Sequence, residues 1–344
     1  MRWRSLLLPF NLPYAAVIRM RNWAFDKGIL KSTAFDLPII ALGNLSTGGT
    51  GKTPHTEAIL RLLPDTKFVV LSRGYGRKSK GFLWVASDAD ADQVGDEPLQ
   101  IKRKFTSIPV AVCEDRVLAI PEILAEYPET EAILLDDAFQ HRYLKAGTYI
   151  LLTTWDKPYF SDKLLPAGDL REPKSGARRA DAVIVTKCPQ YPNSLEIEKW
   201  TKHLGIQGEQ ALFFSKMKAG QAYRLNGEAL SETDIASLKE KEAFTFSAIA
   251  GGASWSKAYK SFFKSLKGEL TYRDHHRFSI HDIKLLKSKV QPGQVVLTTE
   301  KDAMRLQPWL QELEGIEVVY FTLELAFSEE EQLKEFLLSR LKSQ

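Results

Sequence analysis

Short, continuous runs of apolar residues recur through the first half of the chain, separated by stretches with helical spacing. Strands of a parallel sheet read as continuous runs, rather than alternating ones, when both faces of the sheet are covered. Helices are predicted between the runs at residues 54–63 and 116–127. The predicted strands are residues 38–42, 68–71, 133–135, 149–152 and 182–185. The pattern therefore predicts an α/β fold with a mostly parallel sheet.

The apolar runs become sparser between residues 190 and 237, and a small hairpin linker is predicted around 213–225. Beyond it the runs return, and a charged surface helix is predicted at 329–341. Further predicted elements are strands at 244–250, 295–297 and 318–321 and a helix at 255–266. We predict three parts, namely an N-terminal segment at 1–31, a larger domain at 32–225 and a second, smaller α/β domain at 226–344.

The N-terminal segment combines apolar and aromatic residues with basic ones. A helix is predicted at 13–28, because proline suits a first helical turn and glycine a helix end. Pro9, Asn11 and Pro13 interrupt the apolar stretch well before the roughly 20 residues that a membrane span needs. Two interpretations remain at this point, an amphipathic helix lying in a membrane interface or a helix packed on the protein's own core.

Charge is unevenly distributed along the chain. The 344 residues include 47 Lys and Arg against 43 Asp and Glu, a net charge of +4 that excludes a strongly basic nucleic-acid coat, and no nucleic-acid partner is expected. Residues 1–31 alone carry six basic residues against one acidic residue. Anionic lipid attracts a basic, apolar helix, which favours the membrane surface. The two cysteines are too few for a disulfide framework and indicate a reducing compartment.

The clearest chemical motif follows the first predicted strand, where a glycine-rich turn leads into a predicted helix. Glycines in such a turn let backbone N–H groups surround phosphate oxygens, and the helix directs its positive end toward the same anion. Lys52 is predicted to reach the β- and γ-phosphates and Thr53 to ligate Mg²⁺. Ser46 stands where the common pattern has its first glycine. The predicted phosphate-binding residues of this P-loop are Ser46, Thr47, Gly48, Gly49, Thr50, Gly51, Lys52 and Thr53.

A second motif ends the predicted strand at 133–135. Asp136 and Asp137 follow a run of apolar residues, as in a Walker B strand, whose carboxylates hold the Mg²⁺ shell in P-loop enzymes. Many GTPases read guanine with an Asn-Lys-x-Asp sequence, but the nearest candidate here, residues 186–189, lacks its Asn and Asp. ATP and Mg²⁺ are therefore the predicted cofactors.

Further motifs continue in order along nearly the whole chain. They occupy residues 43–45, 48–54, 72–77, 95–99, 136–141, 165–173, 274–275 and 299–303. Together they resemble one family closely, the tetraacyldisaccharide 4′-kinases of lipid A biosynthesis. Two departures concern loop geometry: Ala138 stands where the family usually has glycine, and residues 251–254 replace its usual Gly-Ile-Gly-Asn-like turn.

The resemblance implies transfer of the γ-phosphoryl group of ATP to the 4′-hydroxyl of a tetraacylated disaccharide 1-phosphate, giving lipid IVA. It also implies that Asp96 acts as base and that His275 orients or tunes its carboxylate, since a sugar hydroxyl is a poor nucleophile at neutral pH. Lys52 completes the expected catalytic set. The implied location is the cytoplasmic face of the inner membrane, peripheral or monotopic, with the lipid as partner and no obligate protein partner.

Four more side chains are interpreted as contacts for the sugar or a phosphate. Arg73 follows a predicted strand, where strand ends of an open α/β sheet form ligand crevices, although a solvated turn explains it equally well. Gln140, His141 and Arg171 lie in two of the family motifs. Instead of contacting substrate, they could have a structural role, in a loop hydrogen bond or an ion pair. Residues 300–302 either contact nucleotide or begin a charged helix.

Two other functions compete with this interpretation. A P-loop GTPase or ATPase switch, serving as a delivery module, accounts for the loop and the acidic pair but leaves the second domain and the N-terminal segment unexplained. A soluble α/β ligase with the same loop predicts that vesicle association and activity do not depend on the N-terminal segment.

Overall fold

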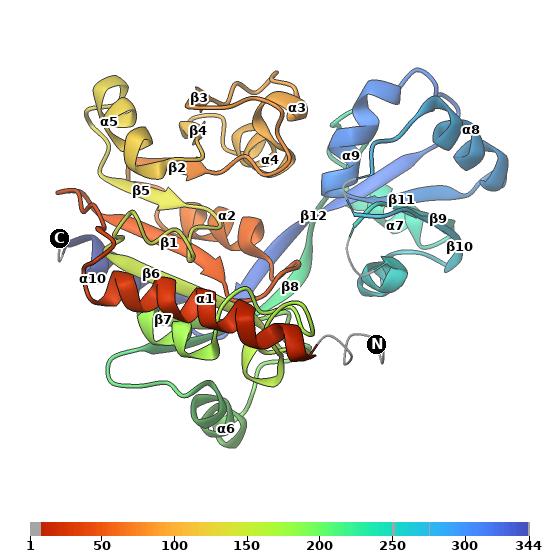
Figure 1. The fold of residues 1–344 in the computed structure, drawn as a ribbon. Helices are drawn as coiled ribbons and strands as arrows, with labels where there is room; N and C mark the ends of the chain where they lie inside the picture. The colour runs from red at the N-terminus through yellow and green to blue at the C-terminus, as the bar shows by residue number, and fades with distance from the viewer. Residues whose placement is uncertain (1–7, 250–251, 275, 343–344) are drawn as a thin grey trace. The chain divides into compact units, whose positions relative to one another are not determined.

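The computed structural model describes residues 8–249, 252–274 and 276–342. The chain forms two compact units, one of Met1–Met217 with Leu325–Gln344 and the other of Lys218–Glu324 (Figure 1). Strands β8 (Ala211–Arg224) and β12 (Val318–Phe327) each contribute residues to both units. The predicted domain at 226–344 differs from this division, because the end of the chain returns to the first unit.

The first unit is built on a sheet with helices on both faces. Its strands, in spatial order from β8, are β7 (Ala182–Thr186), β6 (Thr148–Thr154), β1 (Ile39–Asn44), β5 (Ala132–Leu135), β2 (Phe68–Ser72), β4 (Val110–Val112) and β3 (Leu83–Trp84). The pairs from β8 to β4 are parallel, and β3 is antiparallel to β4. The predicted α/β fold is confirmed. The edge strand β3 and its neighbour β4 escaped prediction because such short segments carry little hydrophobic pattern.

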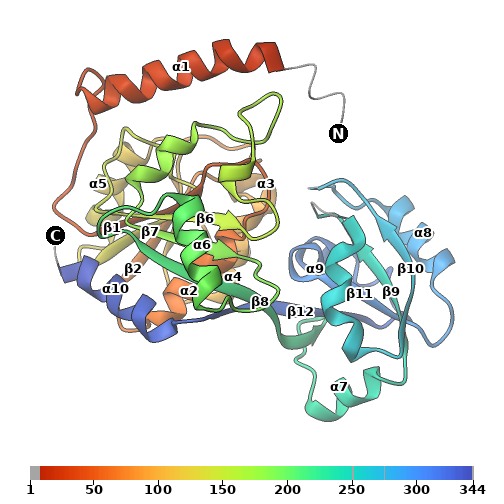
Figure 2. The same ribbon diagram turned by 90° about the horizontal axis from the view of Figure 1, so that it is seen from below.

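Residues of β1 alternate between two core clusters. Ile40 and Leu42 pack with residues of α2 (Lys52–Leu62), α4 (Asp96–Lys104) and α10 (Glu330–Lys342). Ile39 and Ala41 pack with residues of α5 (Arg116–Glu126). Figure 2 shows α5 on the opposite face of the sheet from α2 and α10. Since both faces are covered, every position of the strand is apolar except its last, which explains the continuous run in the sequence.

Helix α10 explains why the chain returns to the first unit. Its outer face is charged, as predicted, but Leu333 and Leu337 are fully buried in the cluster that also contains Phe213 of β8. These leucines need an apolar surface, and the sheet of the first unit provides it. The remaining short elements of this unit are α3 (Ala91–Val94), α6 (Ser194–Leu204) and the 3₁₀ helices η2 (Tyr159–Ser161) and η3 (Lys174–Arg179).

The second unit has its own parallel strands, in the order β10 (Ser265–Thr271), β9 (Glu242–Ser247), β11 (Val295–Thr299) and β12. Its helices are α7 (Glu232–Leu238), η4 (Gly252–Phe262), α8 (Ile280–Lys289), α9 (Glu300–Leu306) and η5 (Gln307–Trp309). Two local predictions are wrong. The expected hairpin linker is the single long strand β8, which pairs with β7 through residues 211–214 and continues into the second unit. The helix expected at 255–266 ends at Phe262, and β10 follows it.

The N-terminal helix α1 (Leu8–Asp26) lies along the first unit on the side remote from α10 (Figure 2). It begins before the predicted residue 13, so that Pro13 stands inside the helix. No helix in the described part of the chain has both the length and the apolar character that crossing a bilayer requires.

Candidate active site

The glycine-rich loop joins β1 to α2, in the strand–loop–helix arrangement that its sequence predicts. Gly51 caps α2 with a φ of 91°, a left-handed conformation that glycine adopts without strain. Lys52 is the first residue of the helix, and Thr53 beside it is buried. The first N–H groups of a helix have no acceptor within it, so this helix start suits an anion such as a phosphate.

Lys52, Asp137 and Arg171 come together from three separate segments. The Lys52 Nζ lies 3.6 Å from Asp137 Oδ2, and the Arg171 Nη1 lies 3.4 Å from Asp137 Oδ1. Asp137 follows β5 with a φ of 50°, a left-handed conformation that Asp tolerates better than most residues. The P-loop lysine and the acidic end of the neighbouring strand are therefore adjacent, as the Walker A and Walker B interpretation requires.

Asp136 is completely buried at the end of β5. The Thr56 hydroxyl of α2 donates to its Oδ1 at 3.1 Å, whereas its Oδ2 has no hydrogen-bond partner among the described residues. Burial, together with the negative charges of Glu97 and Asp137, raises the pKa of Asp136 to about 7, although Lys52 opposes the shift. A buried carboxylate oxygen without a partner is costly unless a cation satisfies it.

These groups fit a Mg²⁺ ion. Carboxylate and hydroxyl oxygens are the hard ligands that Mg²⁺ prefers, and Asp136, Asp137 and Thr53 provide them beside the P-loop. No group of three or more His, Cys, Asp or Glu side chains that could hold a metal occurs in the described ranges. Mg²⁺ in nucleotide enzymes needs no such cage, because it is usually held by one or two carboxylates together with phosphate oxygens and water.

Asp96 is the first residue of α4 and is half-buried. Gly95, just before it, has a φ of 93°, and a side chain there would come within 3.2 Å of the Gly74 backbone. Helix α4 is tied to the P-loop helix by Glu57, which accepts from Gln100 at 2.9 Å and pairs with Lys104 at 2.7 Å. The helix that carries the predicted base is thus anchored to the helix that follows the P-loop. His275, its predicted partner, lies outside the described residues.

Gln140 and Arg171 both help to fasten the chain around the P-loop. The Gln140 amide donates to the Asn44 carbonyl at 2.6 Å and to Glu172 Oε1 at 3.0 Å. The backbone N–H of Arg171 donates to the Leu45 carbonyl at 2.8 Å. The two alternatives that the sequence left open, a loop hydrogen bond for Gln140 and an ion pair for Arg171, are therefore both present.

His141 and Arg73 belong to a positively charged region that the sequence only partly revealed. Burial, followed by the charges of Arg116 and Arg73, lowers the pKa of His141 to about 4. Arg73 itself is exposed, whereas Arg116 at the start of α5 is buried, and burial with the nearby Arg73 lowers its pKa to about 10. Arg116 escaped sequence reasoning, although a lone basic residue opening an otherwise apolar helix was an available signal.

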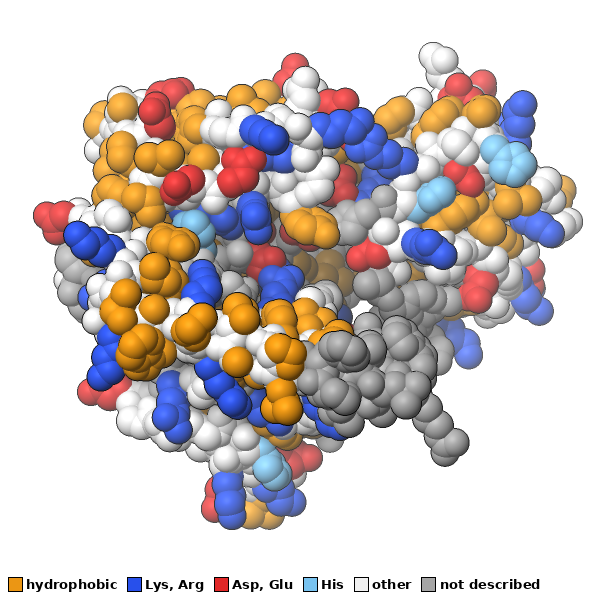
Figure 3. Space-filling model, viewed as in Figure 1, with side chains coloured by type: hydrophobic (Ala, Val, Ile, Leu, Met, Phe, Trp, Pro, Cys, Tyr) orange, Lys and Arg blue, Asp and Glu red, His pale blue; other side chains and the backbone are white. Residues whose placement is uncertain are grey.

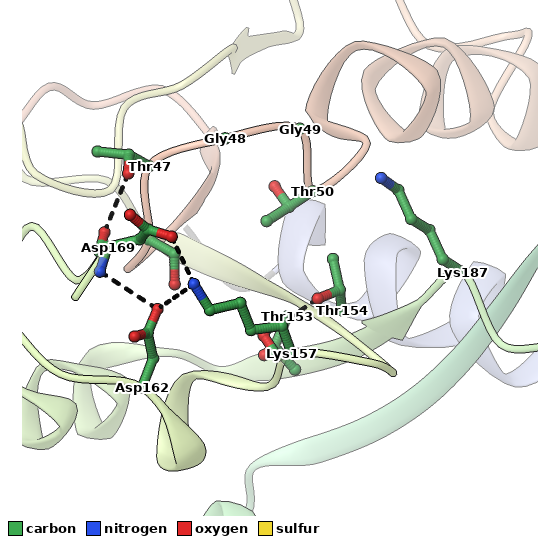
Figure 4. A pocket seen from close by; sticks show the side chains of 11 residues that line it. Thr47, Gly48, Gly49, Thr50, Thr153, Thr154, Lys157, Asp162, Asp169 and Lys187 are labelled. Atoms are coloured by element: carbon green, nitrogen blue, oxygen red, sulfur yellow. Dashed lines mark hydrogen bonds and ion pairs between the residues drawn. The ribbon is translucent and has the colours of Figure 1, made fainter. Parts of the chain in front are cut away.

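A pocket opens beside the P-loop, and Figure 4 shows the side chains that line it. Lys157 pairs with Asp169 and, at 3.1 Å, with Asp162. The Asp169 carbonyl accepts the backbone N–H of Thr47 at 2.7 Å, so this wall is bonded directly to the loop. The full lining comprises Ser46, Thr47, Gly48, Gly49, Thr50, Thr153, Thr154, Lys157, Asp162, Asp169 and Lys187. Lys157, Asp162 and Lys187 lie outside the motifs and were not anticipated.

Helix α1 has two unlike faces. Its inner face bonds to the loops of the site: the Tyr14 hydroxyl donates to the Arg171 carbonyl at 2.7 Å, and Arg21 donates to the Gln140 carbonyl at 3.2 Å. Its outer face is apolar, and Figure 3 shows hydrophobic side chains along it. The most exposed of them are Leu12, Val17, Met20 and Trp23, each more than half accessible. The helix is packed on the protein while leaving an apolar stripe uncovered.

Comparisons with known proteins agree over the whole chain. Residues 3–342 match the family model of tetraacyldisaccharide-1-P 4'-kinase. A tetraacyldisaccharide 4'-kinase of Flavobacterium johnsoniae is 42% identical over 309 residues, covering 88% of each chain. One from Phocaeicola vulgatus is 40% identical over 337 residues, covering 95% of this chain and 91% of that one.

A solved structure gives the same result. The crystal structure of LpxK from Aquifex aeolicus, described as an "apo" form in complex with ATP, superposes with a TM-score of 0.79 and 31% identity. The match covers 98% of this chain and 99% of that one. None of these matches favours a GTPase switch. The order of motifs, the fold and the relatives agree, and the chain belongs to the tetraacyldisaccharide-1-P 4'-kinase family.

Proposed function

We propose that this site uses Mg²⁺ and ATP to phosphorylate the 4′-hydroxyl of a tetraacylated disaccharide 1-phosphate. Membership of the 4'-kinase family makes the protein a phosphotransferase. The observation that carries the assignment of the site is the meeting of Lys52 with Asp137 at 3.6 Å, beside the buried Asp136. Phosphoryl transfer is catalysed mainly by positioning and by stabilising charge, and this arrangement offers both.

The P-loop is the proposed phosphate site. The glycine N–H groups of the loop and those at the start of α2 surround the phosphates, and Lys52 neutralises the oxygens of the β- and γ-phosphates. Thr53, Asp136 and Asp137 would hold Mg²⁺. The chemistry that Mg²⁺ would supply there is positive charge opposite the negative charge that develops on the phosphoryl group during transfer.

Asp96 is the proposed base for the 4′-hydroxyl. In this role its carboxylate accepts the hydroxyl proton as the oxygen attacks the γ-phosphorus, and ADP leaves with the electron pair of the broken bond. An ordinary carboxylate is a weak base, so a neighbouring imidazole that orients or tunes it suits the reaction. We propose His275 for that role on the family resemblance.

The positively charged region beside the P-loop is the proposed binding site for the sugar and its 1-phosphate. Arg73 and Arg171 supply the charge, and Gln140 and His141 lie in the turn that follows β5. His141 is neutral near pH 7 because of its lowered pKa, so it would recognise hydroxyl groups by hydrogen bonding rather than by charge.

We propose that the outer face of α1 lies in the membrane surface. Exposed Leu12, Met20 and Trp23 would enter the acyl boundary, while the basic residues of the N-terminal segment meet anionic head groups. The inner face of the same helix bonds to the loops of Gln140 and Arg171, so the helix places the site next to a lipid substrate. On the family resemblance, we propose a peripheral or monotopic location on the cytoplasmic face of the inner membrane.

A kinase assay with labelled ATP tests this function. The protein should phosphorylate an acylated disaccharide 1-phosphate in the presence of Mg²⁺, with little product from the deacylated disaccharide. Lys52→Ala should reduce turnover by at least about 100-fold, because the ammonium group of Lys52 would no longer stabilise the negative charge on the phosphoryl group in the transition state. Lys78→Ala, at an exposed ion pair, is the matched control and should remain active. Absence of product under conditions where the protein binds Mg·ATP would refute the assignment.

A further inference from the structure

Two consecutive carbonyl groups of the P-loop are held by buried side chains. The Thr186 hydroxyl, at the end of β7, donates to the Thr50 carbonyl at 2.9 Å. The Nδ1 of His55, in the first turns of α2, lies 2.7 Å from the Gly51 carbonyl. Thr186 and His55 are both almost completely inaccessible to solvent. None of the roles assigned above to the phosphate site uses either side chain.

The hydrogen bonds define the tautomer of His55. A carbonyl oxygen can only accept, so Nδ1 carries the proton and donates to Gly51. The Nε2 must then accept, and the hydroxyl of the fully buried Ser215 in β8 lies 2.9 Å from it. Burial of the side chain favours the neutral ring, in which one nitrogen donates and the other accepts.

The geometry of the peptide bond gives these contacts a consequence for phosphate binding. In a trans peptide the C=O and the following N–H point in opposite directions. Holding the Thr50 and Gly51 carbonyls toward Thr186 and His55 therefore turns the N–H groups of Gly51 and Lys52 to the other side of the loop. A side chain at Gly51 would come 3.4 Å from the His55 Nδ1, so the ring lies close under this turn.

We propose that His55 and Thr186 are positioning residues for the nucleotide. They orient the amides of Gly51 and Lys52 toward the phosphates, and Ser215 keeps His55 in the donating tautomer. The inference rests on the proposed phosphate-binding role of residues 46–53, and it concerns affinity for the nucleotide more than the rate of phosphoryl transfer.

Titration of the full-length protein with Mg·ADP, by calorimetry, measures this affinity directly. His55→Leu and Thr186→Val each replace a hydrogen-bond donor by an apolar side chain of similar size. Each substitution should weaken Mg·ADP binding by about fivefold to tenfold. The KM for ATP should rise in parallel, with kcat changing by less than about twofold. His55→Asn keeps an N–H within reach of the Gly51 carbonyl and should restore binding to within about twofold of the wild type.

Helix α6 offers matched controls outside the site. Thr201→Val matches Thr186→Val and removes a hydroxyl that donates to the Ile197 carbonyl at 2.9 Å. His203→Asn makes the same substitution as His55→Asn at a position outside the site. Neither should alter Mg·ADP binding. Thermal unfolding of each variant identifies the temperature range in which it is folded, and the isosteric Thr186→Val decides the question if His55→Leu does not fold.

The outcomes separate this inference from the proposed function. Normal Mg·ADP binding by folded His55→Leu and Thr186→Val would overturn the inference alone. Failure of the wild type to bind Mg·ADP, or unchanged binding by Lys52→Ala, would overturn the assigned phosphate site and the inference with it. Weakened binding by both variants with rescue by His55→Asn would support it, because general damage to packing would not be repaired by one N–H group.

Discussion

At the residue scale, the site contains buried charged groups that destabilise the fold until a ligand neutralises them. Asp136 is the clearest example, since one of its oxygens is buried without a partner in the described structure and its pKa is raised to about 7. Sequence reasoning identified Asp136 and Asp137 from the apolar run before them. It did not distinguish their environments, because burial and the approach of Thr56 and Glu97 depend on the packing of α2 and α4 against β5.

Asp136→Asn should change how the stability of the metal-free protein depends on pH. The unfolded pKa is about 3.9, so the folded protein binds more protons between pH ~4 and ~7 and loses stability as pH rises through that window, by a few kcal/mol at most. The variant should lose this component and be more stable than the wild type at pH 8. Urea unfolding with a chelator checks this.

The same variant should lose the stabilisation that Mg²⁺ with nucleotide gives to the wild type, because the cation would no longer neutralise a buried carboxylate. Unfolding curves with and without Mg·ADP measure this difference. Parallel pH profiles for the wild type and Asp136→Asn would contradict the raised pKa, whereas equal stabilisation by Mg·ADP would contradict the role in metal binding.

At the scale of elements, two sets of polar contacts hold helices in place around the site. Glu57 ties α2 to α4 and so relates the P-loop helix to the helix that begins with Asp96. Polar bonds from α1 to the loops of Gln140 and Arg171 hold the N-terminal helix in place. Helices α1 and α2 were predicted from local pattern, whereas α4 was not. Which helix faces which was not predictable, because each contact joins residues far apart in the chain.

Glu57→Ala should lower the free energy of unfolding by about 1.5–3 kcal/mol, since it removes the fully buried carboxylate that pairs with the half-buried Lys104. Activity should fall as well, because α4 carries the proposed base. Urea unfolding and the kinase assay measure both effects. Glu228→Ala breaks a mostly exposed pair with Arg224 and should cost less than about 1 kcal/mol. Equal losses in the free energy of unfolding for the two substitutions would refute the role of Glu57 in joining α2 to α4.

Met20→Gln combined with Trp23→Gln should weaken binding to anionic phospholipid vesicles by at least about tenfold, because burying each apolar side chain contributes about 1.5–3 kcal/mol. Affinity for Mg·ADP should be unchanged. Co-sedimentation with vesicles measures the first quantity and calorimetry the second. Leu195→Gln, at an exposed leucine of α6, is the control. Undiminished sedimentation of the double variant would exclude α1 as the membrane contact.

At the scale of the whole molecule, the chain leaves its first unit through β8 and returns through β12. The last helix then completes the core of the first unit. The predicted boundary at 225 and 226 was close to the point of departure, but the return was not visible in the sequence. A charged helix at a chain end has the same pattern whichever core receives its leucines.

Leu337→Ala should therefore destabilise the first unit by about 2–5 kcal/mol, as expected for a fully buried leucine. The loss should appear in the melting of the unit that binds nucleotide, so added Mg·ADP should partly offset it. Differential scanning calorimetry with and without Mg·ADP tests both points. The conservative Leu337→Met should cost less than about 1.5 kcal/mol. A melting profile unchanged by Leu337→Ala would contradict the packing of α10.

The sequence alone was sufficient for the parallel α/β class, the P-loop, the acidic strand end and the family, and the comparisons confirm the family and its activity. These features are local, because a glycine-rich turn between a strand and a helix carries its signal in adjacent residues. Tertiary structure alone decided the meeting of Lys52, Asp137 and Arg171, the burial of Asp136, the apolar outer face of α1 and the destination of α10. Each of these depends on residues distant in sequence, whose proximity comes from the packing of whole elements.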